Sequence, residues 1–314
     1  MNPEDQTQPE RIIITGPTAS GKSALAVELG LKINGEIISV DSRQCFKKID
    51  IGTAKPTQVQ MAAVPHHNVS ILSLNEEDTV AEFRKRSERM ASDIEGRAKR
   101  VIYCGGSTLH IQSIIRPLDP IPTADEENVE GLKQEAEEQG LEKLYERLQD
   151  VDPDYAKKMD GLNRQRIIRA LDVWEQTGKP FSSFHSEDPI TLPPRFKLFA
   201  LNHPRPVLHE RISKRTEKML EEGLVQEVRE LLNEGYDPDL QAFNTVGYRQ
   251  VIEFLNGEIS EDQMIKDIKT ATRRYAKRQI TWLRRWPFVE WFDLGKINRG
   301  EAVERILDQV AAEA

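Results

Sequence analysis

Residues 11–30 read RIIITGPTASGKSALAVELG, and this stretch decides the fold. The β-branched run Arg11-Ile-Ile-Ile-Thr15 predicts a buried strand, and Leu25 and Leu29, four residues apart, predict one face of a helix over 23–30. Between them the sequence matches G-x-x-x-x-G-K-[ST], a phosphate-binding loop that joins a strand to a helix. The stretch therefore predicts a strand, a phosphate loop and a helix in that order.

The chemistry of this loop follows from its residue types. Its backbone N–H groups converge on phosphate oxygens, and the N-terminus of the following helix adds positive potential. Lys22 supplies a point charge, and the Ser23 hydroxyl can hold Mg²⁺. We predict binding of a di- or triphosphate, without a choice between them, by Gly16, Pro17, Thr18, Ala19, Ser20, Gly21, Lys22 and Ser23.

The rest of the first 117 residues alternates between strand and helix patterns. Residues 36–41 and 100–105 are short apolar runs typical of buried strands, and 79–98 has a helical pattern between them. Residues 195–201 predict a further strand. This alternation predicts an α/β fold with a parallel, doubly wound sheet of the P-loop type.

The pattern is interrupted after Pro117. Residues 122–152 contain 11 acidic and 3 basic residues in long stretches rich in Glu, Leu and Gln. We expect an all-helical insertion over 118–185 between a first core segment, 1–117, and a second, 186–314, which completes the core and is mostly helical.

Composition narrows the class of protein. The chain has 314 residues and a net charge of −8, with a pI near 5.5, a balance that by itself speaks against a nucleic-acid binder. No window has the ~18 apolar residues of a membrane span, and the first ten residues are unlike a signal peptide, so we expect a cytoplasmic protein without a membrane partner. Cys45 and Cys104 are expected to be small buried residues, and the histidine spacing predicts no metal site.

The average charge hides a basic segment. Without 122–152 the chain is neutral, and residues 266–285 carry eight basic residues against one acidic, a local charge of +7. On a helix Arg273, Arg274, Lys277 and Arg278 would share one face. Alone, such a segment is more often a solvated surface than an RNA contact.

Asp41 is the one acid at the end of an early predicted strand. A nucleotide hydrolase usually has an acid after a second apolar strand, but the strand at 101–104 ends in Gly105-Gly106-Ser107. Asp41 and the phosphate loop both lie at the carboxyl edge of the predicted sheet, where ligands bind. Asp41 is therefore placed to touch an acceptor, or else it only caps the segment that follows.

The motifs taken in order resemble the tRNA dimethylallyltransferases, also called tRNA isopentenyltransferases. The resemblance covers roughly residues 11–290, and the absence of a cysteine-rich zinc finger matches the bacterial type. The matching segments are 16–23 (GPTASGKS), 39–44 (SVDSRQ), 49–56 (IDIGTAKP), 65–67 (PHH), 105–109 (GGSTL), 166–171 (RIIRAL), 177–179 (TGK), 223–228 (GLVQEV), 246–248 (VGY) and 271–284 (ATRRYAKRQITWLR).

This resemblance implies an enzyme that transfers a dimethylallyl group from dimethylallyl diphosphate to N6 of the adenine at tRNA position 37. It implies that the phosphate loop holds the donor's diphosphate with Mg²⁺ rather than ATP, and that Lys22 is catalytic. It places the general base at Asp41 and a catalytic hydroxyl at Ser107, where the family has a threonine. Arg215 is a candidate diphosphate ligand, although Arg211 and Arg215 could equally face the tRNA.

The family also suggests where the anticodon arm of tRNA binds, and the helical insertion is expected to contribute. The amide of Gln44 could read the edge of adenine, whereas Arg166 and Arg169 could pair with acids of the insertion instead of reaching RNA or diphosphate. The expected tRNA contacts are Asp41, Ser42, Arg43, Gln44, Gln165, Arg166, Ile167, Ile168, Arg169, Asn244, Thr245, Val246, Gly247, Tyr248, Arg249, Lys277, Arg278, Gln279, Ile280, Thr281, Trp282, Leu283 and Arg284.

Two other functions fit the residues less completely. A P-loop kinase that phosphorylates a small molecule with ATP would use the same loop and a strand-end aspartate. An RNA-binding nucleotide switch would explain the basic segment, but the missing second-strand acid argues against it. We expect a monomer in each case.

Overall fold

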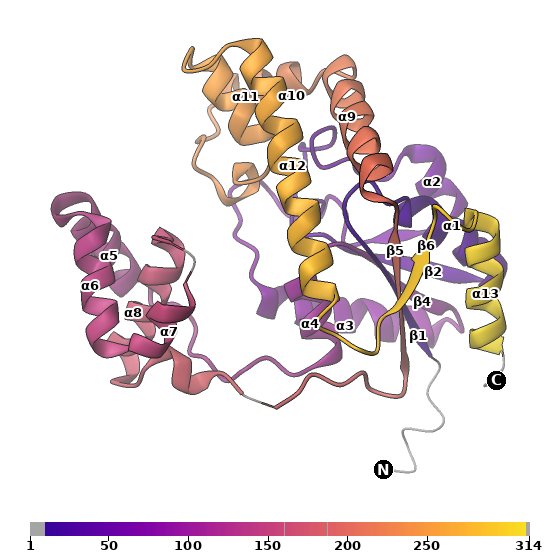
Figure 1. The fold of residues 1–314 in the computed structure, drawn as a ribbon, viewed down its shortest axis with the longest axis horizontal. Helices are drawn as coiled ribbons and strands as arrows, with labels where there is room; N and C mark the ends of the chain where they lie inside the picture. The colour runs from indigo at the N-terminus through magenta and orange to yellow at the C-terminus, as the bar shows by residue number, and fades with distance from the viewer. Residues whose placement is uncertain (1–9, 160, 187, 312–314) are drawn as a thin grey trace. The chain divides into compact units, whose positions relative to one another are not determined.

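A computed structural model of the chain describes residues 10–159, 161–186 and 188–311 (Figure 1). Residues 1–9, on which the expectation of no signal peptide rests, lie outside the described part. The chain divides into two compact units, Met1–Arg116 with Thr191–Ala314, and Pro117–Ile190. The second unit begins one residue before, and ends five residues after, the insertion expected from the sequence. Among the described helices, none has the length and apolar character needed to cross a membrane.

The first unit is built on a parallel sheet, as the sequence predicts, and the sheet has six strands. The strand order is β3-β2-β4-β1-β5-β6, so β1 lies near the middle, between β4 and β5. The strands β3 and β6 are short, and neither was predicted. The strands are β1 (Arg11–Thr15), β2 (Gly35–Val40), β3 (His66–His67), β4 (Arg100–Gly105), β5 (Phe196–Asn202) and β6 (Glu290–Asp293).

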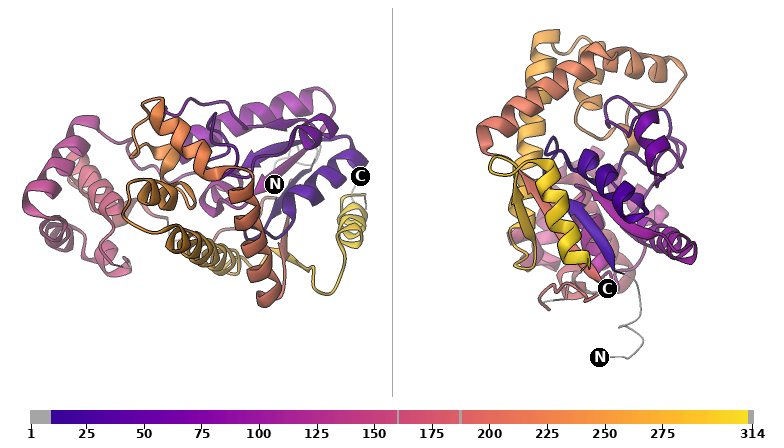
Figure 2. Two further views of the ribbon diagram at one scale, coloured as in Figure 1. Left: turned by 90° about the horizontal axis from the view of Figure 1, so that it is seen from above. Right: turned by 90° about the vertical axis from the view of Figure 1, so that its right-hand side faces the viewer.

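Helices cover both faces of the sheet, which makes it doubly wound. On one face α1 (Lys22–Ile33) packs beside α13 (Arg299–Ala311) over a core that includes Ile12, Ile14 and Leu25 (Figures 1 and 2). On the other face α3 (Val80–Gly96) packs on β2 and β4 and against α4 (Thr108–Ile115). Because β1 and β4 are buried on both sides, their central residues, Ile12–Ile14 and Val101–Cys104, form continuous apolar runs instead of an alternating pattern.

Four further helices form a second core in the same unit, which we call the α9–α12 bundle. It contains α9 (Arg205–Glu221), α10 (Leu224–Asn233), α11 (Tyr248–Leu255) and α12 (Glu261–Leu283), with the single-turn helix η3 (Gln241–Phe243). In the loop that follows β2, Cys45, Phe46 and Ile49 join the buried core of this bundle, whereas the six-residue helix α2 (Gln58–Ala63) contacts α1. The carboxyl edge of the sheet is therefore bordered by the bundle.

The second unit is all-helical. It comprises α5 (Glu126–Gln139), α6 (Leu141–Val151), α7 (Pro153–Lys158), α8 (Arg164–Thr177) and the 3₁₀ turn η2 (Phe181–Phe184). Leucines of α5 and α6 pack with α8 in a separate core, and the buried Asp152 caps α7 through the N–H of Tyr155 at 3.0 Å. Its acidic residues lie mostly on the exposed faces of α5 and α6.

Candidate active site

The phosphate loop lies where the sequence predicts it, between β1 and α1 at the carboxyl edge of the sheet. Gly16 has no room for a side chain, because an added Cβ would lie 2.3 Å from the carbonyl oxygen of Leu201. Gly21 has φ of +97° and precedes the first turn of α1, which has no side-chain cap. The N–H groups at this helix start are therefore available to an anion.

Three side chains from outside the loop hold its backbone. Gln279 of α12 accepts the N–H of Thr18 at 2.9 Å, and Arg211 of α9 donates to the carbonyl of Ala19 at 2.7 Å. The ring nitrogen Nε2 of His203 lies 3.1 Å from the carbonyl oxygen of Ser20. This arrangement was not predicted, because no local pattern links the loop to residues 183 to 261 positions away in the sequence.

Cationic side chains surround the loop without a strong counter-charge. Burial and the nearby Arg215 lower the pKa of Lys22, while Cys104 and Asp41 oppose the shift, and the Nζ of Lys22 lies 3.4 Å from the carbonyl of Pro17. Burial likewise lowers the pKa of Arg215, and the charge of Asp41 is what favours its cation. Such a site gains stability when an anion binds.

Asp41 directly follows β2 and stabilises a tight turn. Its Oδ1 accepts the N–H groups of Arg43 at 2.9 Å and of Gln44 at 3.3 Å. Asp41 therefore caps the segment that follows it, as the alternative interpretation predicted, although residues 42–45 form a turn and not a helix.

The side chain of Gln44 faces inward, which corrects its expected role. Its Oε1 accepts the hydroxyl of Ser39 at 2.8 Å, and its Nε2 donates to the carbonyls of Thr53 and Ala54. Because both ends of the amide are used, Gln44 shapes the loop after β2 and is not free to read adenine.

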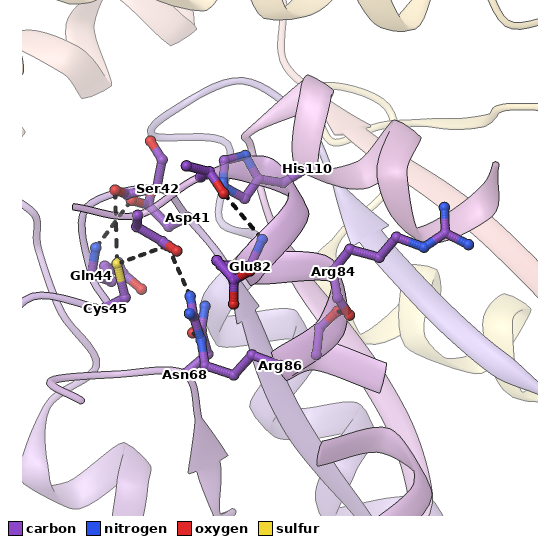
Figure 3. A network of polar contacts seen from close by, with 12 residues as sticks. Asp41, Ser42, Gln44, Cys45, Asn68, Glu82, Arg84, Arg86 and His110 are labelled. Carbon is purple, nitrogen blue, oxygen red and sulfur yellow. Dashed lines mark hydrogen bonds and ion pairs between the residues drawn. The ribbon is translucent and has the colours of Figure 1, made fainter. Parts of the chain in front are cut away.

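A polar network supports this turn from below (Figure 3). Arg86 of α3 donates to Asn68 at 2.9 Å and to Asp78 at 2.8 Å, and Asn68 donates to the carbonyl of Ser39. Asp78 also accepts the thiol of Cys45 at 3.6 Å. Cys45 is therefore buried as predicted but is not purely apolar in its contacts.

A cavity of about 460 Å³ opens between the loop, the Asp41 turn and the α9–α12 bundle, and we call it the Asp41 cavity. It collects many of the predicted residues from four distant parts of the chain. Its lining includes Thr18, Asp41, Ser42, Arg43, Arg215, Asn244, Thr245, Val246, Gly247, Arg249, Tyr275 and Arg278. Arginines outnumber the carboxylate, so the cavity favours anionic ligands.

Ser107 lies at the start of α4, beside the end of β2. Its N–H donates to the carbonyl of Val40, and its Oγ lies 2.7 Å from Nδ1 of His110. Burial lowers the pKa of His110 to about 4, so its imidazole is neutral near pH 7. The pairing of Ser107 with His110 gives the hydroxyl a fixed partner, which the sequence analysis did not foresee.

Several predicted tRNA contacts are buried, and this corrects the expectation for their side chains. Tyr248 is fully buried and donates its hydroxyl to Glu227, which also accepts the N–H groups of Asp50 and Ile51 at 2.9 Å. Leu283 and Gln279 are buried between α12 and the core. These side chains hold elements together, since apolar burial and satisfied hydrogen bonds leave them nothing to offer a ligand.

Of the four basic residues predicted to share one face of α12, Arg273, Arg274 and Lys277 line one cavity, whereas Arg278 does not. Arg278 lines the Asp41 cavity and lies over the ring of Tyr275. Lys277 and its neighbours line a separate cavity of about 620 Å³ on another side of the helix, which we call the cationic cavity. Its lining includes His203, Arg205, His209, Arg273, Arg274, Lys277, Ile280, Thr281, Arg284 and Asp293. Trp282 lies outside both linings and is contacted by Arg285.

The helical unit presents only part of its predicted contacts. Gln165 and Arg166 are exposed on α8, whereas Ile167 and Ile168 are buried in its core. Arg169 pairs with the buried Asp172 and donates to the carbonyl of Pro122. Of the two roles considered for Arg169, the structure thus has it paired with an acid of the insertion.

The side chains near the phosphate loop show which kind of metal ion the site would suit. The described residues contain no cluster of three or more His, Cys, Asp or Glu side chains suited to a metal ion. Ser23 is exposed at the loop, and Asp41 is close enough to influence the charge of Lys22. A hydroxyl and one carboxylate fit an ion that takes most of its ligands from water and phosphate, as Mg²⁺ does.

A phosphate loop that opens into an arginine-lined cavity with one carboxylate defines a P-loop enzyme acting on a phosphorylated substrate. The model of the IPP transferase family matches residues 44–286, which is most of the chain. The chain is 43% identical to the tRNA dimethylallyltransferase of Thermoanaerobacter sp. (strain X514), over 94% of this chain and 95% of that protein. It is 42% identical to that of Carboxydothermus hydrogenoformans, over 96% of both. The chain therefore belongs to the IPP transferase family, the tRNA dimethylallyltransferases.

Solved structures agree with this assignment. The full-length tRNA isopentenylpyrophosphate transferase from Bacillus halodurans superposes with a TM-score of 0.71 at 33% identity, covering 98% of this chain and 97% of that one. A eukaryotic dimethylallyltransferase described as acting on tRNA gives a TM-score of 0.79 at 25% identity, covering 97% of this chain and 80% of that one. The resemblance drawn from the sequence motifs is confirmed.

Proposed function

We propose that this protein transfers a dimethylallyl group from dimethylallyl diphosphate to N6 of the adenine at position 37 in the anticodon arm of tRNA, acting as a monomer. The observation that carries the proposal is the Asp41 cavity, in which an anion-binding loop and a lone carboxylate face the same space. Diphosphate would bind at Gly16–Ser23, with Lys22 and Arg215 neutralising its charge.

In this transfer the chain has to stabilise the leaving diphosphate and accept a proton from adenine. The N6 lone pair attacks C1 of the dimethylallyl group, the bond from C1 to the bridging oxygen breaks, and diphosphate leaves with that electron pair. Negative charge grows on diphosphate, which Lys22, Arg215 and the loop N–H groups stabilise. The adenine amine becomes acidic as its bond to carbon forms, and Asp41 takes its proton. Ser107 offers a hydroxyl close to Asp41 that His110 keeps oriented.

Enzymes of this family generally need a divalent metal ion, and the phosphate loop of this chain has a residue that could hold one. Ser23 would hold Mg²⁺ together with the diphosphate oxygens, and the metal would supply further charge neutralisation of the leaving group. No water has to be activated in this reaction, which accounts for the lack of a hydrolase acid after β4.

The cationic cavity supports tRNA as the acceptor. Arg205, Arg274, Lys277 and Arg284 form no ion pair with any described residue, and Arg273 donates only to the hydroxyl of Ser213. Elsewhere on the same two helices three lysines are paired, namely Lys214 with Glu210, Lys218 with Glu222 and Lys269 with Glu217. Cations that lack partners and gather at one cavity suit RNA phosphates.

The assay is direct. Purified protein is incubated with Mg²⁺, dimethylallyl diphosphate and unmodified tRNA with adenines at positions 36 to 38, and the nucleosides are analysed by mass spectrometry. We expect one prenyl group on A37 and none on a tRNA with guanine at 37. Nucleotide-dependent tRNA binding without product would support the switch instead, and ATP consumption with a small acceptor would support the kinase, which the family assignment does not favour.

A further inference from the structure

Gln279 of α12 contacts two of the segments that form the site. Its Oε1 accepts the N–H of Thr18 in the phosphate loop at 2.9 Å, and its Nε2 donates to the carbonyl of Gly106 at 2.8 Å. The side chain is only 4% exposed. A buried amide that is satisfied at both ends fixes the distance between the two backbones that it joins.

The sequence at 105–106 is built around this contact. A Cβ on Gly106 would lie 2.3 Å from Nε2 of Gln279 and 3.3 Å from the carbonyl oxygen of Gly16. A Cβ on Gly105 would lie 1.9 Å from the carbonyl oxygen of Val40, the residue before Asp41. The two glycines therefore let the end of β4 lie close to both the end of β2, which Asp41 follows, and the side chain of Gln279.

The same amide reaches the wall of the Asp41 cavity. Gln279 lies one helical turn after Tyr275, and Tyr275 lines the cavity with Asp41. The loop N–H that Gln279 uses belongs to Thr18, so the N–H groups of Gly21, Lys22 and Ser23 at the start of α1 stay available for phosphate.

We propose that Gln279 is a positioning residue, which holds the phosphate loop and the Gly105-Gly106 segment in register beneath the Asp41 cavity, so that diphosphate affinity depends on it. This inference rests on the proposed function, because it assumes diphosphate as the ligand of the loop. It also replaces the expectation that Gln279 touches tRNA.

The test compares Gln279→Ala and the closely isosteric Gln279→Met with wild type by calorimetric titration with inorganic diphosphate and Mg²⁺. Gln263→Ala is the matched control, since Gln263 lies on the same helix and its side chain donates to Asp267, away from the phosphate loop. We expect both Gln279 variants to bind diphosphate about tenfold more weakly, as the loss of two hydrogen bonds implies. In the transfer assay the KM for dimethylallyl diphosphate should rise by a similar factor, with the KM for tRNA changed less than twofold.

A double-mutant cycle identifies the contact itself. Gly106→Ala should weaken diphosphate binding in wild type, because the added methyl displaces the Gln279 amide, but should add little in the Gln279→Ala background. Additive effects would contradict the proposal. Circular dichroism and melting curves check that each variant is folded.

Other outcomes separate the positioning role of Gln279 from the proposed prenyl-transfer function. Unchanged diphosphate affinity in both Gln279 variants, or an equal loss in Gln263→Ala, would overturn the positioning role. A loss of tRNA affinity alone would make Gln279 a tRNA contact after all. If wild type bound diphosphate but transferred no prenyl group, the proposed function would fail while the comparison of variants still decided the role of Gln279. Wild type that bound no diphosphate would refute both.

Discussion

Asp41 and Arg43 form a closed turn, in which Oδ1 of Asp41 accepts the backbone N–H of Arg43 at 2.9 Å. The other oxygen, Oδ2, receives no hydrogen bond from any residue that the structure describes. One oxygen of the carboxylate thus fixes its own orientation, and the other is left for a ligand in the Asp41 cavity. This division lets a structural and a chemical role be separated by substitution.

Asp41→Asn should retain the turn and lose the base. The asparagine Oδ1 can still accept the N–H of Arg43, but the amide cannot take a proton from adenine. We expect kcat to fall by about 10² to 10⁴ with the melting temperature within about 2 °C of wild type. Asp41→Ala should lose activity to the same extent and stability as well. Near-normal turnover of Asp41→Asn would remove Asp41 as the general base.

The fold was predictable from the sequence because its signals are local. The strand, loop and helix of 11–30 and the apolar runs at β2, β4 and β5 are set by patterns within a few residues. The strands β3 and β6 have two and four residues, of which only Phe292 is fully buried, so no apolar run marked them.

The site was only partly predictable, for the opposite reason. Asp41 and the phosphate loop could be found from strand ends and a motif, but Glu227, His203 and Gln279 act across more than 170 positions of sequence. The buried Tyr248 and Leu283 show the limit of motif transfer, since a segment can line a site while particular side chains within it face the core. Periodicity also placed four basic residues of α12 on one face, and three of them line the cationic cavity, whereas Arg278 lines the Asp41 cavity.

Ala19 provides a test of the loop backbone, because it has φ of +63°, in the left-handed region that non-glycine residues rarely adopt. A β-branched side chain is strongly disfavoured there, so Ala19→Val should lower the free energy of unfolding by about 2 kcal/mol. Ala24→Val in the adjacent helix α1 should cost only about 0.5 kcal/mol. Urea unfolding of both variants measures the difference, and equal effects would mean that the left-handed conformation carries no strain.

The cationic cavity should contribute to tRNA binding through charge. Arg274→Ala and Lys277→Ala each remove an unpaired cation, so each should reduce the slope of log Kd against log salt concentration by about one. Each should also weaken the binding of all tRNAs by a similar factor. Lys214→Ala, which removes a lysine already paired with Glu210, is the control and should leave the slope unchanged. Fluorescence titrations at several salt concentrations give the slopes. Wild-type slopes in both Arg274→Ala and Lys277→Ala would exclude the cavity from the tRNA interface.

Acidification should destabilise the protein through His110. Burial is the main cause that lowers its pKa to about 4, with Arg43 and Arg86 adding to the shift while Asp78 and Asp41 oppose it. The unfolded chain, with an ordinary histidine pKa near 6.5, therefore binds the proton more readily than the folded protein. The stabilisation is complete above about pH 6.5 and is lost as the pH falls toward 4, by about 2 kcal/mol at pH 5. Urea unfolding at pH 7.5 and pH 5 should show this loss of stability in wild type and a smaller loss in His110→Gln. The control is His185→Gln, which replaces an exposed histidine of the helical unit and should show the same loss as wild type. An equal pH dependence in wild type and His110→Gln would mean that His110 does not stay neutral in the folded protein.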